Sequence, residues 1–355
     1  MKVGIVSQYG HDNFGNKLQN YALQQVLLQY ADEVITLRNE PKACNIWEYL
    51  RWYSDVSESA AVSMLLGKKK RAAFLNFQRR YLQTSKGIYP LNGEAVKLRK
   101  KDRCDLYCAG SDQVWKPGSG RAGSFQLLEF ARKDQCFSYA ASFGVDRLPQ
   151  EVTEQMRQGL SRFQYISVRE ESGKKIAESL TGRQNIPVLP DPTLLLPREK
   201  WGEIARKPAF SLPERYLLTY FLGSVTPERR KKLKEKVLQM GCTIVDPETL
   251  PAGPEEFLYL IQNALLVCTD SFHGSIFAVI FRRPLLIFPR RGGECMHGRL
   301  ETLAATLKLQ NCLLREDCIP AHLPEYPDPE DILAAERKRA HAYLEQVFRD
   351  AERNL

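Results

Sequence analysis

The sequence has no long apolar run. Its apolar stretches are short and are interrupted by prolines and charged residues, as at Arg282 and Arg283, whereas a helix that spans a membrane needs about 20 apolar residues. Residues 1–6 predict a buried strand and lack the apolar segment and cleavage site of a signal peptide. We therefore expect a cytoplasmic protein.

Metal-ligand spacings and cofactor motifs are also missing. Cys104 and Cys108 lie four residues apart, but neither a histidine nor a second cysteine pair is near them, so the spacing does not indicate zinc. The 9 cysteines are an odd number, and we expect reduced core residues. Neither a dinucleotide-binding fingerprint, a Walker sequence nor an RNA-binding aromatic motif is present. We expect no cofactor, no metal and no nucleic-acid partner.

Positive charge, by contrast, is in excess. The formal net charge is +9, and much of the excess lies in two basic runs at residues 68–71 and 97–103. This balance fits an anionic small substrate or peripheral contact with the anionic inner face of a membrane. The other interpretation is a solvated basic surface without a partner.

The chain is long enough for two domains. Short apolar strands, polar turns and helical segments alternate along its 355 residues, which predicts an α/β fold with parallel sheets. The proline-punctuated segment 196–213 is the best linker. We expect a first domain at 1–197 with an insertion at about 41–100, a second domain at 198–328, and a terminal helix at 329–355.

One strand–turn–helix unit places a histidine at a functional edge. Residues 265–269 predict a buried strand, residues 270–274 a polar turn, and a helix begins near Ser275. Ligands of parallel sheets bind at the carboxyl ends of the strands, and a helix N-terminus there suits an anion. His273 is therefore a candidate acid, base or phosphate ligand, and a structural histidine is the alternative.

Two further strand ends of the first half carry charged candidates. Asp112 follows a buried strand and is a candidate base or hydroxyl ligand, although a helix N-cap has the same pattern. Arg169 follows the strand predicted at 165–168 and suits a carboxylate or phosphate. The alternative for Arg169 is a salt bridge to Glu170 or Asp191.

The loop at residues 9–16 is rich in glycine and asparagine. Its glycines allow a ligand to approach the backbone closely, and Asn13, Asn16 and Gln19 are candidates for hydrogen bonds to sugar hydroxyls. A plain surface loop is the alternative.

Taken in order, several segments resemble the polysaccharide pyruvyl transferase family. The matching segments are residues 13–23 (NFGNKLQNYAL), 110–115 (GSDQVW), 138–144 (SYAASFG), 167–170 (SVRE), 191–193 (DPT) and 269–274 (TDSFHG). They span about residues 1 to 300.

The resemblance implies two Rossmann-like domains facing a cleft, as in B-type glycosyltransferases, with the terminal helix packing back toward the first. It also implies phosphoenolpyruvate as donor and, as acceptor, a hexose of a surface polysaccharide or of its lipid-linked precursor. The product is a pyruvate ketal. The first domain would form the acceptor side and the second the donor side.

The resemblance also assigns residues. It implies donor binding for Arg169 and donor contact or proton delivery for His273, and it places Ser271 and Gly274 beside the donor. Many members have arginine where this chain has Ser271. Arg299 is our candidate for restoring that charge, with Arg290 and Arg291 as alternatives for the same role.

Two other functions remain open. One is a nucleotide-sugar-dependent glycosyltransferase with the same two-domain architecture. The other is a non-catalytic glycan-binding assembly protein, which would bind glycan without turnover.

Overall fold

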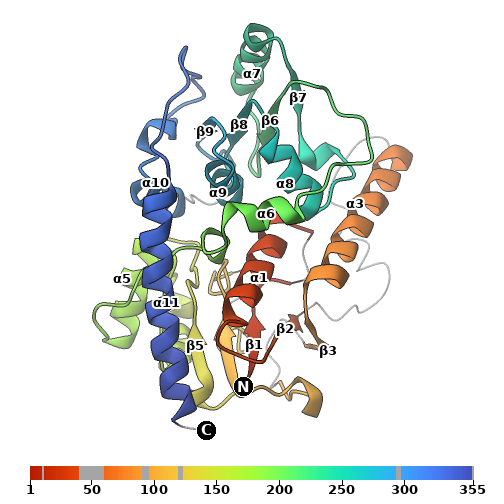
Figure 1. Ribbon diagram of the computed structural model, residues 1–355. Coiled ribbons are helices and arrows are strands. Elements are labelled where there is room, and N and C mark those ends of the chain that lie inside the picture. The colour runs from red at the N-terminus through yellow and green to blue at the C-terminus, as the bar shows by residue number, and fades with distance from the viewer. Residues whose placement is uncertain (10–11, 40–59, 90–95, 119–122, 293–296, 354–355) are drawn as a thin grey trace.

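The computed structural model describes residues 1–9, 12–39, 60–89, 96–118, 123–292 and 297–353 (Figure 1).

The first sheet of the molecule is parallel. Five strands pair in parallel in the order β3-β2-β1-β4-β5. Their bounds are β1 Lys2–Val6, β2 Glu33–Asn39, β3 Thr84–Tyr89, β4 Leu106–Ala109 and β5 Cys136–Ser138.

Beyond β5, the described residues continue the sheet through single bridges. Tyr165 pairs with Phe137, and Val168 pairs with both Ala141 and Val188. The regular strand predicted at residues 165–168 is therefore wrong. The reason is local, because the hydroxyls of Ser138 and Ser167 bond to the neighbouring backbone and replace ladder hydrogen bonds.

The second sheet has four parallel strands in the order β7-β6-β8-β9. Its elements are β6 Tyr216–Tyr220, α7 Pro227–Met240, β7 Thr243–Val245, α8 Pro254–Gln262, β8 Leu266–Thr269, α9 Phe272–Ile280 and β9 Leu285–Ile287. A short helix, α6 Arg198–Ile204, lies between the two sheets (Figure 1).

Helices cover the first sheet and join it to the second. They are α1 Phe14–Leu27, α3 Ala60–Tyr81, α4 Gln150–Leu160, α5 Glu171–Thr181, α10 His297–Leu307 and α11 Glu330–Glu352. Each sheet together with its helices is called a unit below. The last helix, α11, runs back along the first unit (Figure 1), where the Tyr343 hydroxyl donates to the Ser138 carbonyl at 2.6 Å. Residues 84–89 of the expected insertion are the edge strand β3, while 40–59 and 90–95 lie outside the described residues.

An apolar contact holds the two units together. Phe14 of α1 stacks on Phe257 of α8 with ring centroids 4.5 Å apart, and one continuous core cluster includes residues of both sheets. Two Rossmann-like units therefore face each other through the carboxyl ends of their strands, and the fold class predicted from the sequence is confirmed. The domain boundaries at 197 and 328 stay predictions.

Within the described ranges, no helix is long and apolar enough to cross a membrane.

Candidate functional site

The site lies where two helix N-termini from different sheets meet. Asn13 caps α1 by accepting a hydrogen bond from the Asn16 backbone at 3.1 Å, and Ser271 caps α9 by accepting one from Gly274 at 3.3 Å. Helix α9 begins three residues before the predicted Ser275, and α1 begins inside the loop predicted at residues 9–16. His273 is therefore in the first turn of α9 rather than in a loop.

The contact between the two helices depends on a glycine. A Cβ atom built on Gly15 would lie 2.1 Å from Nδ1 of His273 and 2.9 Å from the Cβ of His273. Real atoms do not approach so closely, so only glycine fits at this position without moving a helix. His273 is 7% exposed and is held between this glycine and the first unit.

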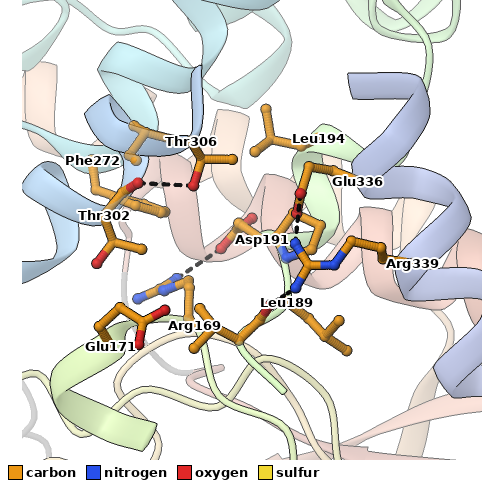
Figure 2. A pocket seen from close by; sticks show the side chains of 13 residues that line it. Arg169, Glu171, Leu189, Asp191, Leu194, Phe272, Thr302, Thr306, Glu336 and Arg339 are labelled. Carbon is orange, nitrogen blue, oxygen red and sulfur yellow. Dashed lines mark hydrogen bonds and ion pairs between the residues drawn. The ribbon is translucent and has the colours of Figure 1, made fainter. Parts of the chain in front are cut away.

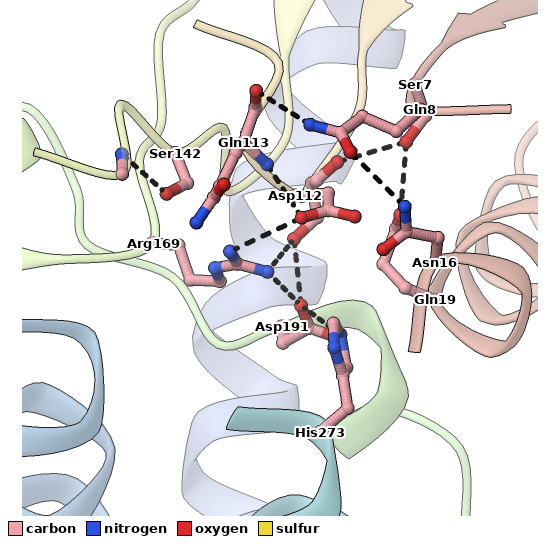
Figure 3. Close-up of polar contacts among 12 residues, drawn as sticks. Ser7, Gln8, Asn16, Gln19, Asp112, Gln113, Ser142, Arg169, Asp191 and His273 are labelled. Carbon is pink, nitrogen blue, oxygen red and sulfur yellow. Dashed lines mark hydrogen bonds and ion pairs between the residues drawn. The ribbon is translucent and has the colours of Figure 1, made fainter. Parts of the chain in front are cut away.

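On its other side His273 faces a buried carboxylate. Asp191 Oδ2 lies 3.5 Å from Nε2 of His273 and accepts a hydrogen bond from Nη1 of Arg169 at 2.7 Å (Figure 3). Ser111 Oγ donates to the same oxygen at 2.9 Å, and Thr193 donates to Oδ1 through its backbone and hydroxyl. The structure thus brings Arg169 and His273 together, but on two sides of one carboxylate rather than across an open gap.

Arg169 uses only part of its guanidinium in these bonds. Its Nη2 lies 3.9 Å from Asp112 Oδ1, and within the part of the chain that the structure describes neither Nη2 nor Nε has a hydrogen-bond partner. The group lies 4.5 Å from the ring centroid of Phe272. The salt bridge to Asp191 is therefore present, and one edge of the guanidinium remains available to an anion.

Asp112 has a strained backbone. Its φ is +81°, a region that residues other than glycine rarely adopt. Its carbonyl accepts hydrogen bonds from Val114 and Ser142, and these bonds hold the turn. Oδ1 accepts from the Gln113 backbone at 2.8 Å, whereas the buried Oδ2 has no partner among the described residues. Asp112 is therefore not a helix cap.

A second arginine adds positive charge. Arg299, in the first turn of α10, is buried and lies 5.9 Å from the ring centroid of Phe272. Burial and then the charge of Arg169 lower the pKa of Arg299 to about 10. Burial would also lower the pKa of Arg169, but Asp191 and Asp112 outweigh it and raise that pKa.

Burial by itself would raise the pKa of Asp191. The charges of His273 and Arg169, together with the hydrogen bond from Thr193, outweigh that cost and hold the pKa well below its ordinary value. The carboxylate is therefore ionised at neutral pH and is the fixed counter-ion of the site.

A small cavity opens beside this cluster (Figure 2). It has a volume of about 100 Å³, and its lining includes Arg169, Glu171, Asp191, Phe272, Thr302 and Arg339. The first unit, α9, α10 and α11 all contribute walls, so the cavity lies at the junction of both units and the terminal helix.

The candidate acceptor residues form a polar layer next to Asp112 (Figure 3). Asn16 donates to Oε1 of Gln8 at 3.2 Å, and Gln8 donates to the Gln113 carbonyl at 3.0 Å. Gln19 is fully buried and accepts from Ser7 Oγ at 3.1 Å. Asn13 is occupied as a cap. Sugar binding by these residues stays a prediction.

Sequence reasoning did not assign Gly15, Phe272 or a central place for Asp191. A signal existed for Asp191, because an aspartate before proline and threonine at the end of an apolar segment is typical of a cap. No local pattern marks Phe272 as the partner of two arginines. Among the described residues, no group of three or more His, Cys, Asp or Glu is placed to hold a metal.

Comparisons with known proteins point to one family. The model of the family described as Polysaccharide pyruvyl transferase matches residues 13–291, most of the chain. No curated protein matches the sequence significantly.

Solved structures match this chain over most of its length at low identity. A putative UDP-N-acetylglucosamine 2-epimerase from Listeria monocytogenes is 11% identical with a TM-score of 0.49, over 99% of this chain and 90% of that one. The UDP-GlcNAc 2-epimerase from Neisseria meningitidis is 12% identical with a TM-score of 0.48, over 99% and 94%. The E. coli ADP-heptose lps heptosyltransferase II is 12% identical with a TM-score of 0.32, over 99% and 100%. With TM-scores below 0.5, these likenesses carry no argument about activity.

Proposed function

Since the chain belongs to the polysaccharide pyruvyl transferase family and is a transferase, we propose that its donor is phosphoenolpyruvate. The acceptor in this proposal is a hexose of a surface polysaccharide or of its lipid-linked precursor. The reaction joins C2 of the donor to two sugar hydroxyls, giving a pyruvate ketal and inorganic phosphate. The methylene carbon gains one proton, and the second hydroxyl proton leaves with phosphate.

One observation carries the proposal. Arg169, Arg299 and His273 converge at the junction of the two units, beside the N-terminus of α9. Phosphoenolpyruvate has a carboxylate and a phosphate, and buried guanidinium groups bind such anions strongly. We assign donor binding to Arg169 and Arg299, with Ser271 and Gly274 at the helix terminus, and proton delivery to His273.

The acceptor in this proposal binds on the Asp112 side of Arg169. We assign Asp112 as the base that takes a proton from an acceptor hydroxyl, because its Oδ2 is buried without a partner among the residues described. Asn13, Asn16 and Gln19 are assigned to the sugar.

The test is to incubate the protein with phosphoenolpyruvate and candidate glycans. We expect phosphate release together with a pyruvyl mass gain on the glycan, and a rate at least about 100-fold lower for His273→Gln, as expected for loss of a general acid. Sugar addition from a nucleotide sugar would instead indicate a glycosyltransferase. Glycan binding without turnover, unaffected by His273→Gln, would indicate an assembly protein.

Arg299 is predicted to supply the charge that Ser271 does not. Replacing Arg299 with glutamine is expected to raise the donor KM at least about tenfold, since a buried charged hydrogen bond to the donor is lost. The control is Arg230→Gln, which removes an exposed arginine of α7 in the same unit. Equal KM values for both variants would exclude Arg299 from donor binding.

The two basic runs do not form one surface. Lys2, at the start of β1, donates to the Lys101 carbonyl at 3.0 Å, so residues 97–103 lie at the amino end of the first sheet, away from the site. Lys70 of α3 pairs with Glu248 of the second unit. A cytoplasmic location is part of this proposal. Contact of Lys68 and Lys69 with an anionic membrane is another part, and sedimentation with anionic vesicles tests that contact.

A further inference from the structure

We infer that one side of helix α3 is a docking surface for an anionic bilayer, and that the acceptor is therefore the lipid-linked precursor rather than a polysaccharide in solution. This side, called the outer face of α3 below, consists of Lys68, Lys69, Ala72, Leu75 and Arg79. The statement about the acceptor rests on the proposed function. The docking itself does not depend on it.

The charge of α3 has one sign. Its sequence, AAVSMLLGKKKRAAFLNFQRRY, contains neither aspartate nor glutamate, and an apolar run at residues 60–66 precedes the first basic residues. The exposed helix α7, by contrast, mixes both signs, since its Lys232 lies 4.0 Å from Glu228 and 3.4 Å from Glu235. Helix α3 therefore attracts anions without acidic residues of its own to offset that attraction.

The inner side of α3 is used to hold the two units together. Phe74 is fully buried there. Lys70 pairs with Glu248 of the second unit at 2.6 Å. One helical face further on, Arg80 pairs with Glu255 of the same unit, also at 2.6 Å. These cations are thus committed to contacts within the molecule.

The cations of the outer face have no such contacts. Lys68, Lys69 and Arg79 are exposed, and among the described residues none of the three has a hydrogen-bond or ion-pair partner. Leu75 lies between them at helical spacing and is 38% exposed. Unpaired lysine and arginine beside an exposed leucine are typical of helices that lie at a membrane interface, where the cations attract anionic headgroups.

The shape of the outer face favours a bilayer over other anions. From Lys68 to Arg79 it extends about 16 Å along the helix, so its cations are spread out instead of converging on one small anion. It also carries no aromatic side chain on which a nucleic-acid base could stack. A flat anionic surface is the partner that fits.

The position of α3 links this surface to the candidate site. The helix runs past the junction of the two units (Figure 1), and the ring of Phe74 lies 5.1 Å from that of Phe14, the residue before Gly15. About one helix diameter, roughly 10 Å, therefore lies between a docked bilayer and Phe14. An acceptor whose lipid stays in the bilayer can present its sugar at the junction from this side.

Sedimentation with vesicles of phosphatidylcholine and phosphatidylglycerol tests the docking. The variant combines Lys68→Gln, Lys69→Gln and Arg79→Gln. Each cation near an anionic surface strengthens binding about fivefold, so we expect this variant to bind at least about 100-fold more weakly than wild type. Leu75→Asn is expected to weaken binding several-fold, including at salt concentrations that screen the charges, because its contribution is apolar.

The matched control combines Arg230→Gln, Lys231→Gln and Lys234→Gln on the exposed face of α7 and lowers the net charge by the same amount. We expect it to change binding by less than about twofold, because charges more than a Debye length from the bilayer are screened. An equal loss in both variants, or no loss in the α3 variant, would overturn the inference. So would binding of wild type to soluble dextran sulfate but not to vesicles, which would assign the outer face of α3 to an anionic glycan.

Activity gives a second readout. The glycan that accepts pyruvate is presented either on a lipid in the same vesicles or free in solution. For the α3 variant we expect the acceptor KM to rise at least about tenfold with the lipid form at unchanged kcat, and to equal that of wild type with the free form. Equal KM increases with both forms would refute the lipid-linked acceptor. If wild type does not consume phosphoenolpyruvate, the proposed function fails, while sedimentation still decides the docking.

Discussion

Replacing Gly15 with alanine is expected to lower kcat/KM at least about 100-fold, the size of effect that a misplacement of about 1 Å in a site produces. The added Cβ would lie 2.1 Å from Nδ1 of His273. Turning the ring does not relieve the clash, because the Cβ of His273 is itself 2.9 Å away. One helix must therefore move, and overpacking of this kind costs about 1–3 kcal/mol of unfolding free energy. Steady-state kinetics and denaturant unfolding measure the two effects.

Gly202→Ala is the matched control. Gly202 lies in α6, has no heavy atom within 4 Å of a built Cβ, and tests the general effect of alanine in a helix. We expect unchanged kinetics and a stability gain of up to about 1 kcal/mol. If Gly15→Ala behaved like this control, the two N-termini would not meet as the structure shows.

How far the sequence predicts this molecule depends on how local each feature is. Local residues mark both ends of helix α7 Pro227–Met240, because Thr226 caps it, proline starts it and Gly241 ends it in the left-handed conformation. The starts of α1 and α9 were predicted too late, because a glycine lies in the first turn of each and suggests a loop. In the structure, those glycines instead let neighbouring side chains approach the helix backbone closely.

The arrangement of the site could not be predicted from spacing. The resemblance singled out Arg169 and His273, which the structure brings to one carboxylate, but nothing local shows that Asp191 lies between them. That geometry depends on how the two units dock, which Phe14 and Phe257 set through an apolar contact far apart in sequence. Contacts between side chains of different units produce no periodic pattern in the sequence of either unit.

Replacing Arg169 with lysine is expected to have the second large effect. A lysine keeps the charge but lacks the planar guanidinium, which lies against Phe272 while its Nη1 donates to Asp191 at 2.7 Å and to Ser111 at 3.3 Å. Breaking a buried pair costs about 3–5 kcal/mol, and we expect a loss approaching the lower value because some charge compensation remains. For the reaction, kcat/KM for the donor should fall at least about 100-fold, since the guanidinium edge left for the donor is lost.

The pH dependence separates this loss from a general destabilisation. The depressed pKa of Asp191 contributes stability that is present above the ordinary aspartate value of about 4 and is lost as pH falls through the folded-state pKa. The stability gap between wild type and Arg169→Lys is therefore expected to be full at pH 7 and to shrink below about pH 4. Arg132→Lys is the control, because Arg132 makes two bonds to Asp134 at the exposed surface and exposed pairs contribute about 0–1 kcal/mol. A stability difference between wild type and variant that does not change with pH would mean that Arg169 stabilises the fold by packing on Phe272 rather than by its charge. Asp191 would then not be the counter-ion of the site.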